Sequence, residues 1–248
     1  NGPLYKSAFL PEGLDASRWD SIQPLITDLR DREVRNLGEL ERWLLDRSDL
    51  EAACSEARAS LYINMTCNTE DSGAQQAYTT YVQEVPPRLS PALFELDKKQ
   101  AALFDRFTPD PARYGVLDRA TRAEVELFRP ENVPIETDLA LLSQKYEQVV
   151  GAMTVRFEDR EQTLPQMARY QEMTDRALRE SAWRTVFDRR LKDAEVIDSI
   201  YDEMIALRHR VAVNAGFPDF VGYAFKSKHR FDYGVRECEE FHRGVEEA

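Results

Sequence analysis

Residues 175–248 read DRALRESAWRTVFDRRLKDAEVIDSIYDEMIALRHRVAVNAGFPDFVGYAFKSKHRFDYGVRECEEFHRGVEEA, and this stretch decides the fold class. Apolar residues recur in it every three or four positions, the spacing of one face of a helix. The longest such stripe consists of Val196, Ile200, Met204, Leu207 and Val211. Asn214-Ala215-Gly216 follows, with Pro218 just beyond, and this order predicts a helix that ends at a left-handed glycine. The stretch therefore predicts consecutive helices.

Helical spacing also dominates the preceding residues. We expect helices near 22–29, 37–44, 50–65, 74–85, 91–104, 120–128 and 138–149. The residues expected to cap helices are Asn36, Asp49, Ser90, Thr137 and, for the last helix, Asp232. Pro86-Pro87 and the 108–111 segment should separate helices because proline cannot continue the preceding turn. The last apolar stripe reaches Ala248 without a stop signal, so we expect the chain to end inside a helix.

One segment changes its period. Residues 153–157 alternate between apolar and polar side chains, and Glu158-Asp159-Arg160 then turns the chain into 161–164. Alternation with a period of two predicts a β-hairpin. The fold class is therefore mainly α, a multi-helix N-terminal lobe with a small β-hairpin. We place the domain boundary at the hairpin, which gives an N-terminal helical domain over 1–150 and a second helical region over 151–248.

Composition excludes some functions. The chain has 33 basic and 45 acidic residues, a net charge of −12, so we expect no nucleic-acid partner. It contains no apolar run long enough to span a bilayer and no secretory signal, which predicts no membrane association. The three cysteines are widely spaced and odd in number, which favours a reducing compartment over a disulfide framework. We therefore expect a cytoplasmic protein.

No local motif for catalysis is present. The three histidines are His209, His229 and His242, and none begins a His-Glu-x-x-His motif. Cys238, His242 and Glu246 are spaced four and four on the last predicted helix and could approach a metal in principle. We favour the simpler interpretation that Cys238 belongs to the apolar stripe and that the other two form an exposed pair. No residue of this chain is accordingly assigned as catalytic, cofactor-binding or metal-binding.

An aromatic cluster lies between the last two long helical patterns. Its members are Phe217, Phe220, Tyr223, Phe225, Phe231 and Tyr233. We favour packing of a bent connection between helices over contact with a ligand, because aromatic residues act mostly through buried area.

A series of short segments carries a resemblance to a known family. They are FRPENVPIET at 128–137, GAMTV at 151–155, QTLPQM at 162–167, NAGF at 214–217 and RFDY at 230–233. Their order and spacing over 124–247 resemble the M3 family of zinc metallo-oligopeptidases, in particular oligoendopeptidase F. The resemblance implies that 151–248 holds the hairpin and first helices of an α-helical zinc-peptidase catalytic region. The zinc motif of that family would then lie beyond Ala248.

The resemblance also implies a function. The intact protein would be a zinc-dependent metalloendopeptidase that hydrolyses internal bonds of oligopeptides, with its zinc ligands outside this chain. Its partners would be oligopeptide substrates and the remainder of its own catalytic domain, and this chain alone would be inactive and bind no zinc. A second hypothesis is a non-catalytic, all-helical binding or scaffolding module. The sequence following Ala248 would discriminate between the two.

Overall fold

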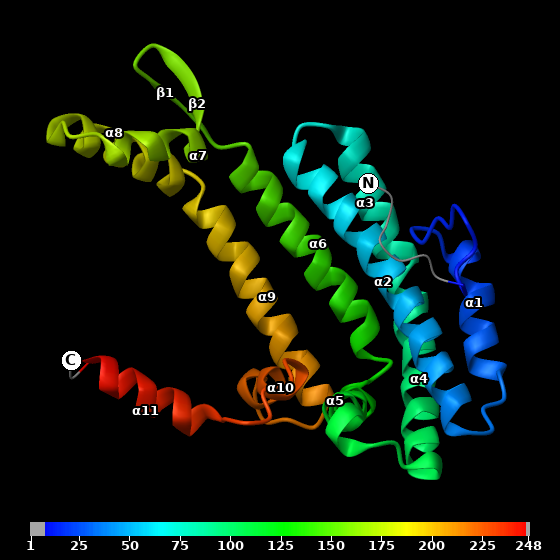
Figure 1. Ribbon diagram of the computed structural model, residues 1–248. Helices are drawn as coiled ribbons and strands as arrows, with labels where there is room; N and C mark the ends of the chain where they lie inside the picture. The colour runs from blue at the N-terminus through cyan, green and yellow to red at the C-terminus, as the bar shows by residue number, and fades with distance from the viewer. Residues whose placement is uncertain (1–7, 247–248) are drawn as a thin grey trace. The chain divides into compact units, whose positions relative to one another are not determined.

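The computed structural model describes residues 8–246, and it is mainly α-helical with one β-hairpin (Figure 1). The first six helices are α1 (Trp19–Asp31), α2 (Leu37–Cys67), α3 (Ser72–Glu84), α4 (Pro86–Phe107), α5 (Pro111–Leu127) and α6 (Asn132–Gly151). The hairpin follows as β1 (Thr154–Phe157) and β2 (Arg160–Thr163). The later helices are α7 (Leu164–Met167), the 3-10 helix η1 (Ala168–Glu172), α8 (Arg176–Leu191), α9 (Ala194–Asn214), α10 (Phe220–Ser227) and α11 (Val235–Glu246). The predicted fold class is confirmed.

The described residues divide into two compact units. Unit 1 comprises 8–60, 80–137 and 208–246, and unit 2 comprises 61–79 and 138–207. Helices α2, α3, α6 and α9 each contribute residues to both units. The boundary predicted near residue 150 falls inside unit 2, and the assignment of 151–248 to a catalytic region stays a prediction.

The core of unit 1 is formed where α1, α2 and α4 meet. Its fully buried side chains include Ile22, Leu29, Leu40, Trp43, Leu50 and Leu96. The indole nitrogen of Trp43 donates a hydrogen bond of 2.8 Å to the carbonyl oxygen of Leu29. Lys99 also donates to this carbonyl, at 2.8 Å, and to the carbonyl of Arg32, at 2.6 Å. The ammonium group therefore satisfies carbonyl oxygens that the end of α1 leaves free.

The hairpin of unit 2 packs against α8 (Figure 1). Its turn residues Glu158 and Asp159 have φ values of 49° and 61°, as a two-residue type I′ turn requires. Val155 pairs with Gln162 across the hairpin, and both are buried. Val155 belongs to a hydrophobic cluster with Met167, Tyr170 and Ala182. The partly buried side chains packed against this cluster are Phe157, Leu164, Leu178 and Val186. The predicted hairpin is confirmed, with Arg160 in the second strand.

Several predicted helix starts are wrong because local capping signals lie inside longer helices. Asp49 starts no helix, since α2 continues through it and buries Leu50 and Cys54 on the same side. Ser90 is likewise internal. Helix α4 begins at Pro86, where a proline costs no hydrogen bond, and the amide of Leu89 already bonds to the Val85 carbonyl at 2.8 Å.

The same error affects the next two helices. Helix α5 begins at Pro111 instead of near 120, because the Asp110 side chain accepts a hydrogen bond of 2.9 Å from the Ala112 amide. Thr137 lies inside α6, and its hydroxyl donates to the Val133 carbonyl at 3.2 Å.

The predicted end of α9 is confirmed, whereas the predicted start of α11 is wrong. Gly216 has a φ of +89°, and the amide of Phe217 bonds to the Ala212 carbonyl at 2.9 Å, which closes α9. Asp232 does not cap α11, which starts at Val235, and forms an ion pair of 3.6 Å with Arg119 instead. No helix within residues 8–246 combines the length and apolarity needed to cross a bilayer.

Two glycines should respond oppositely to alanine. A Cβ at Gly151, the last residue of α6, would lie 2.5 Å from Cγ2 of Thr69, whereas a Cβ at Gly115 in α5 would meet nothing closer than 3.9 Å. We expect Gly151→Ala to lower the free energy of unfolding by about 1–3 kcal/mol through overpacking. Gly115→Ala should raise it by about 0.5–1 kcal/mol by restricting the unfolded chain. Chemical denaturation measures both values, and equal signs would contradict the packing at Gly151.

Candidate functional site

The residues singled out in the sequence for metal binding do not form a metal site. Cys238, His242 and Glu246 occupy successive turns of α11, where Cys238 is half-buried and the other two are exposed. No group of three histidine, cysteine, aspartate or glutamate side chains within residues 8–246 is arranged to hold a metal ion. The side chains present here therefore do not fit the three-ligand zinc centre that the resemblance implies for the whole protein.

The other two histidines have surface or structural surroundings. His209 is exposed on α9. A ring nitrogen of His229 lies 2.9 Å from Oε1 of Glu124, and its ring stacks on Phe231 with centroids 5.6 Å apart. This contact links α5 to the segment that follows α10, within unit 1.

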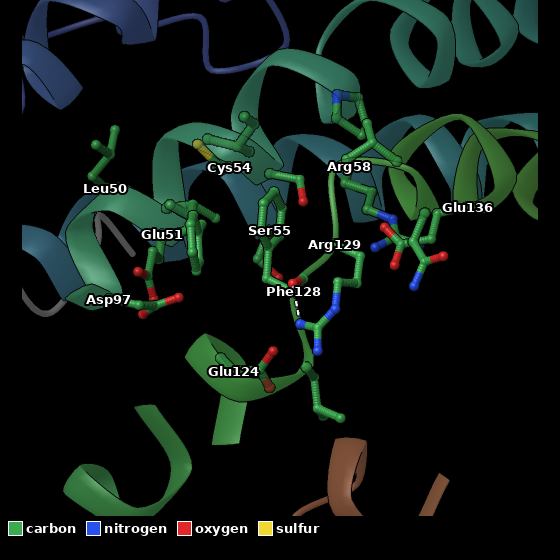
Figure 2. Close-up of a pocket in the computed structure, with 18 of the residues that line it drawn as sticks. Leu50, Glu51, Cys54, Ser55, Arg58, Asp97, Glu124, Phe128, Arg129 and Glu136 are labelled. Carbon is green, nitrogen blue, oxygen red and sulfur yellow. Dashed lines mark hydrogen bonds between the residues drawn. The ribbon is translucent and has the colours of Figure 1, made fainter. Parts of the chain in front are cut away.

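A cavity of about 590 Å³ lies entirely within unit 1 (Figure 2). Helices α2, α4, α5 and the first turns of α6 line it, with Tyr81 from α3 and Tyr223 from α10. Its apolar wall consists of Leu50, Tyr81, Pro86, Leu89, Leu93, Phe94, Leu127, Phe128 and Val133. Phe94 and Phe128 stack with ring centroids 4.2 Å apart. Apolar cavities of this size with a few polar groups are the usual form of a binding site for an organic ligand.

A buried polar network forms one side of the cavity. Nη2 of Arg47 lies 2.5 Å from Oδ1 of Asp97, its Nη1 donates to Gln100 at 3.0 Å, and its Nε donates to Glu51 at 2.6 Å. Gln100 in turn donates to the Thr121 hydroxyl at 2.6 Å. Because each charge has an opposite partner and Gln100 is bonded at both ends of its amide, the network holds α2, α4 and α5 together at this wall.

Burial and charge shift the pKa values of this network. Burial raises the pKa of the Asp97 carboxyl, and Arg47 offsets part of that effect. Burial works against the charged form of Arg47, but the carboxylates of Glu51 and Asp97 outweigh it and raise the pKa of the guanidinium. Arg47 therefore stays charged and bound to its two carboxylates.

Two more carboxylates, Glu124 and Glu136, line the cavity together with Tyr223. Partial burial in the cavity, followed by the charge of Glu124, raises the pKa of Glu136, although the residue as a whole is exposed to solvent. Burial and the two carboxylates raise the pKa of the Tyr223 hydroxyl to about 12. Within residues 8–246, Glu136 has no hydrogen-bond or ion-pair partner, whereas Glu124 has His229. The cavity thus contains a carboxylate that lacks a counter-charge from the described residues.

The candidate nucleophiles of the cavity are not activated. Cys54 is 7% exposed, and burial followed by the charge of Glu51 raises the pKa of its thiol to about 11. A protonated thiol is a poor nucleophile. The described hydrogen bonds join neither Cys54 nor Ser55 to a histidine. Cys54 and Ser55 therefore show none of the contacts that would activate a nucleophile among the described residues.

Sequence reasoning missed this cavity. Glu124 and Glu136 lie in the part of the chain that carried the family resemblance, but neither was singled out as a site residue. For Tyr223 the sequence predicts a packing role. It does pack on Phe217 and Phe220, with centroids 5.8 Å and 5.7 Å away, and it also lines the cavity. The available signal was the run Arg129–Glu136, whose polar residues span the break before α6 and its first turns.

Comparison with known proteins gives matches among solved structures. No protein-family model and no curated protein matches the sequence. A structure described as an oligoendopeptidase F matches with a TM-score of 0.85 at 19% identity, over 96% of this chain and 42% of its own. Pz peptidase A, solved with an inhibitor, matches with a TM-score of 0.78 at 23% identity, over 92% of this chain and 40% of its own.

A third match is described as an oligoendopeptidase F from Bacillus anthracis str. Ames. Its TM-score is 0.79 at 18% identity, over 92% of this chain and 42% of its own. This chain thus spans about two fifths of the length of each of these structures. Identities this low establish the fold and leave activity to be tested. The predicted resemblance is confirmed at the level of fold: most of this chain folds like part of an oligoendopeptidase F or a Pz peptidase A.

Proposed function

We propose that this chain is the N-terminal portion of a zinc-dependent oligopeptidase that hydrolyses internal bonds of short peptides. The shared fold with oligoendopeptidase F and Pz peptidase A supports the proposal most strongly. The order of short segments over 124–247 supports it independently, because those segments were recognised from residues alone. The zinc ligands would lie outside this chain, since the described residues offer none.

In this proposal the chain contributes substrate binding, and chemistry is supplied elsewhere. A bound zinc would polarise the scissile carbonyl and activate a water molecule. The helices of this chain would form one wall of the peptide-binding channel. Such a wall would select substrates by size and charge, because a narrow channel excludes folded proteins. The cytoplasm is the proposed compartment.

The proposal is tested on the complete product of the gene that encodes this chain. We expect it to cleave a short, internally quenched peptide, to lose that activity with a zinc chelator, and to regain it when zinc is added. The isolated 248-residue chain should cleave nothing.

Two results would contradict this assignment. Chelator-sensitive cleavage by the isolated chain would place the chemistry inside it. A folded gene product that cleaves no short peptide, with or without zinc, would favour the alternative of a helical binding module. The exposed apolar residues of α11, among them Phe241 at 70% exposure and Val245 at 61%, are the surface that such a module would use.

A further inference from the structure

The cavity of unit 1 carries an excess of negative charge. Four carboxylates line it (Glu51, Asp97, Glu124 and Glu136), against three guanidiniums (Arg47, Arg58 and Arg129). Arg47 is bound to Glu51 and Asp97 at 2.6 Å and 2.5 Å. Asp97 and Glu136 both also experience the charge of Glu124. By formal count, the lining therefore carries one more negative charge than positive charge.

The donors of Arg129 are directed to backbone carbonyls. It donates to the carbonyl oxygens of Phe128 at 2.7 Å, Glu126 at 2.9 Å and Asn214 at 3.1 Å. These contacts hold the guanidinium at the ends of α5 and α9, and it forms no hydrogen bond or ion pair with Glu136 in the described part of the chain. Arg58 is exposed and has no partner in the described part of the chain.

The remaining walls suit an organic cation. The stacked rings of Phe94 and Phe128, with Tyr81 and Tyr223, give the cavity four aromatic side chains, and the ammonium of Lys98 already lies 4.8 Å from the Phe94 ring centroid. Aromatic faces attract ammonium and guanidinium groups, and the attraction strengthens away from water. A metal cation needs several ligands at once, and no group of three histidine, cysteine, aspartate or glutamate side chains among residues 8–246 is arranged to hold one. A carboxylate beside aromatic and aliphatic walls therefore points to a cation with an apolar stem.

We propose that this cavity binds the basic side chain of a peptide, with the charged end paired to Glu136 and the methylene stem against the aromatic wall. Lysine and arginine side chains have this combination of a charged head and an apolar stem. A volume of about 590 Å³ lies within the range that holds small organic ligands. That the ligand is a peptide rests on the proposed function; that it is an organic cation rests on the cavity alone.

The test compares two peptides that differ in one charge. One carries arginine and the other the uncharged isostere citrulline, and binding to the complete gene product is measured at pH 8, where an ordinary histidine is neutral. We expect the arginine peptide to bind about tenfold more tightly, as for a charged hydrogen bond in a partly buried site. The preference for the arginine peptide should weaken as salt is added, because salt screens the charge of Glu136. Glu136→Gln should remove both the preference and this salt dependence.

Two further substitutions test whether the effect of Glu136→Gln on peptide binding is specific to that carboxylate. Glu131→Gln removes one carboxylate from the exposed residue that precedes α6 and does not line the cavity, so the preference should persist. Arg58→Gln removes the free cation of the lining, and the arginine peptide should then bind more tightly. An unchanged preference in Glu136→Gln, or equal losses in the two glutamate variants, would overturn the proposal. Weaker binding of the arginine peptide to Arg58→Gln would also overturn it.

The proposed function is judged separately, by cleavage of the citrulline peptide by the unmodified protein. If that peptide is cleaved while Glu136→Gln retains the preference, the cavity proposal fails and the oligopeptidase assignment stands. If neither peptide is cleaved but the preference is present and depends on Glu136, the cavity proposal stands and the assignment fails.

Discussion

Replacing Arg47 by methionine is expected to lower the free energy of unfolding by about 3–5 kcal/mol, the usual cost of leaving one charge of a buried pair uncompensated. Asp97 is only 9% exposed, and Gln100, which also accepts a hydrogen bond from Arg47, is 2% exposed. Without the guanidinium, both side chains lose a hydrogen-bond partner at positions that are largely removed from solvent. Urea denaturation followed by circular dichroism measures the loss.

The loss should also depend on pH. In Arg47→Met the pKa of Asp97, already raised by burial, rises further because its counter-charge is gone. The native variant then binds a proton at a pH where the unfolded chain does not. Its stability deficit should therefore shrink as the pH falls through the raised pKa of Asp97.

Two controls separate charge from packing. The double variant Arg47→Met/Asp97→Leu removes both charges and should recover most of the loss, because buried pairs are often replaceable by apolar residues. Arg184→Gln breaks the exposed ion pair with Glu180, whose side chains are 65% and 57% exposed, and should cost less than about 1 kcal/mol. A double variant as unstable as the single one would show that the stem of Arg47, and not its charge, is what matters.

Replacing Trp43 by alanine should have an effect of similar size, about 3–5 kcal/mol. Trp43 is fully buried, donates to the Leu29 carbonyl and has the ammonium of Lys99 5.6 Å from its ring centroid. Truncation would open a cavity at the junction of α1, α2 and α4, which close packing does not tolerate. Thermal and chemical denaturation both measure the change.

The same substitution at Trp183 is the control. That residue is 47% exposed on α8 and contacts the ring of Phe187 at a centroid distance of 4.3 Å, so its loss should cost less than about 1 kcal/mol. The loss of unfolding free energy in Trp43→Phe should fall between those of Trp43→Ala and Trp183→Ala. Phenylalanine keeps most of the side-chain volume, and the Leu29 carbonyl still accepts a hydrogen bond from Lys99. Equal effects at Trp43 and Trp183 would contradict the assignment of the core.

The sequence alone predicted those features that depend on neighbouring residues. The hairpin is one, because alternation and the turn at Glu158-Asp159 act over a few positions. The end of α9 is another, because Gly216 and Pro218 follow its apolar stripe directly. The order of helices and the mainly α fold class follow from the same short-range signals.

The wrong helix starts show that packing can outweigh a local capping signal. Asp49, Ser90 and Thr137 can each cap a helix, but each lies where the apolar face of a longer helix continues. The area buried by the continuing helix outweighs one capping hydrogen bond, since a cap contributes only about 1 kcal/mol.

Only the tertiary structure decided the cavity and its charge. Arg47 and Asp97 are 50 positions apart and Glu124 and His229 are 105 apart, so no spacing in the sequence could pair them. Six helices contribute side chains to the lining of the cavity, and burial then changes what each side chain can do. The sequence thus determined the helices and where several of them end. The packing decided how far each carboxylate is removed from water and which charges it meets, because desolvation depends on every element around a group and not only on the residues beside it.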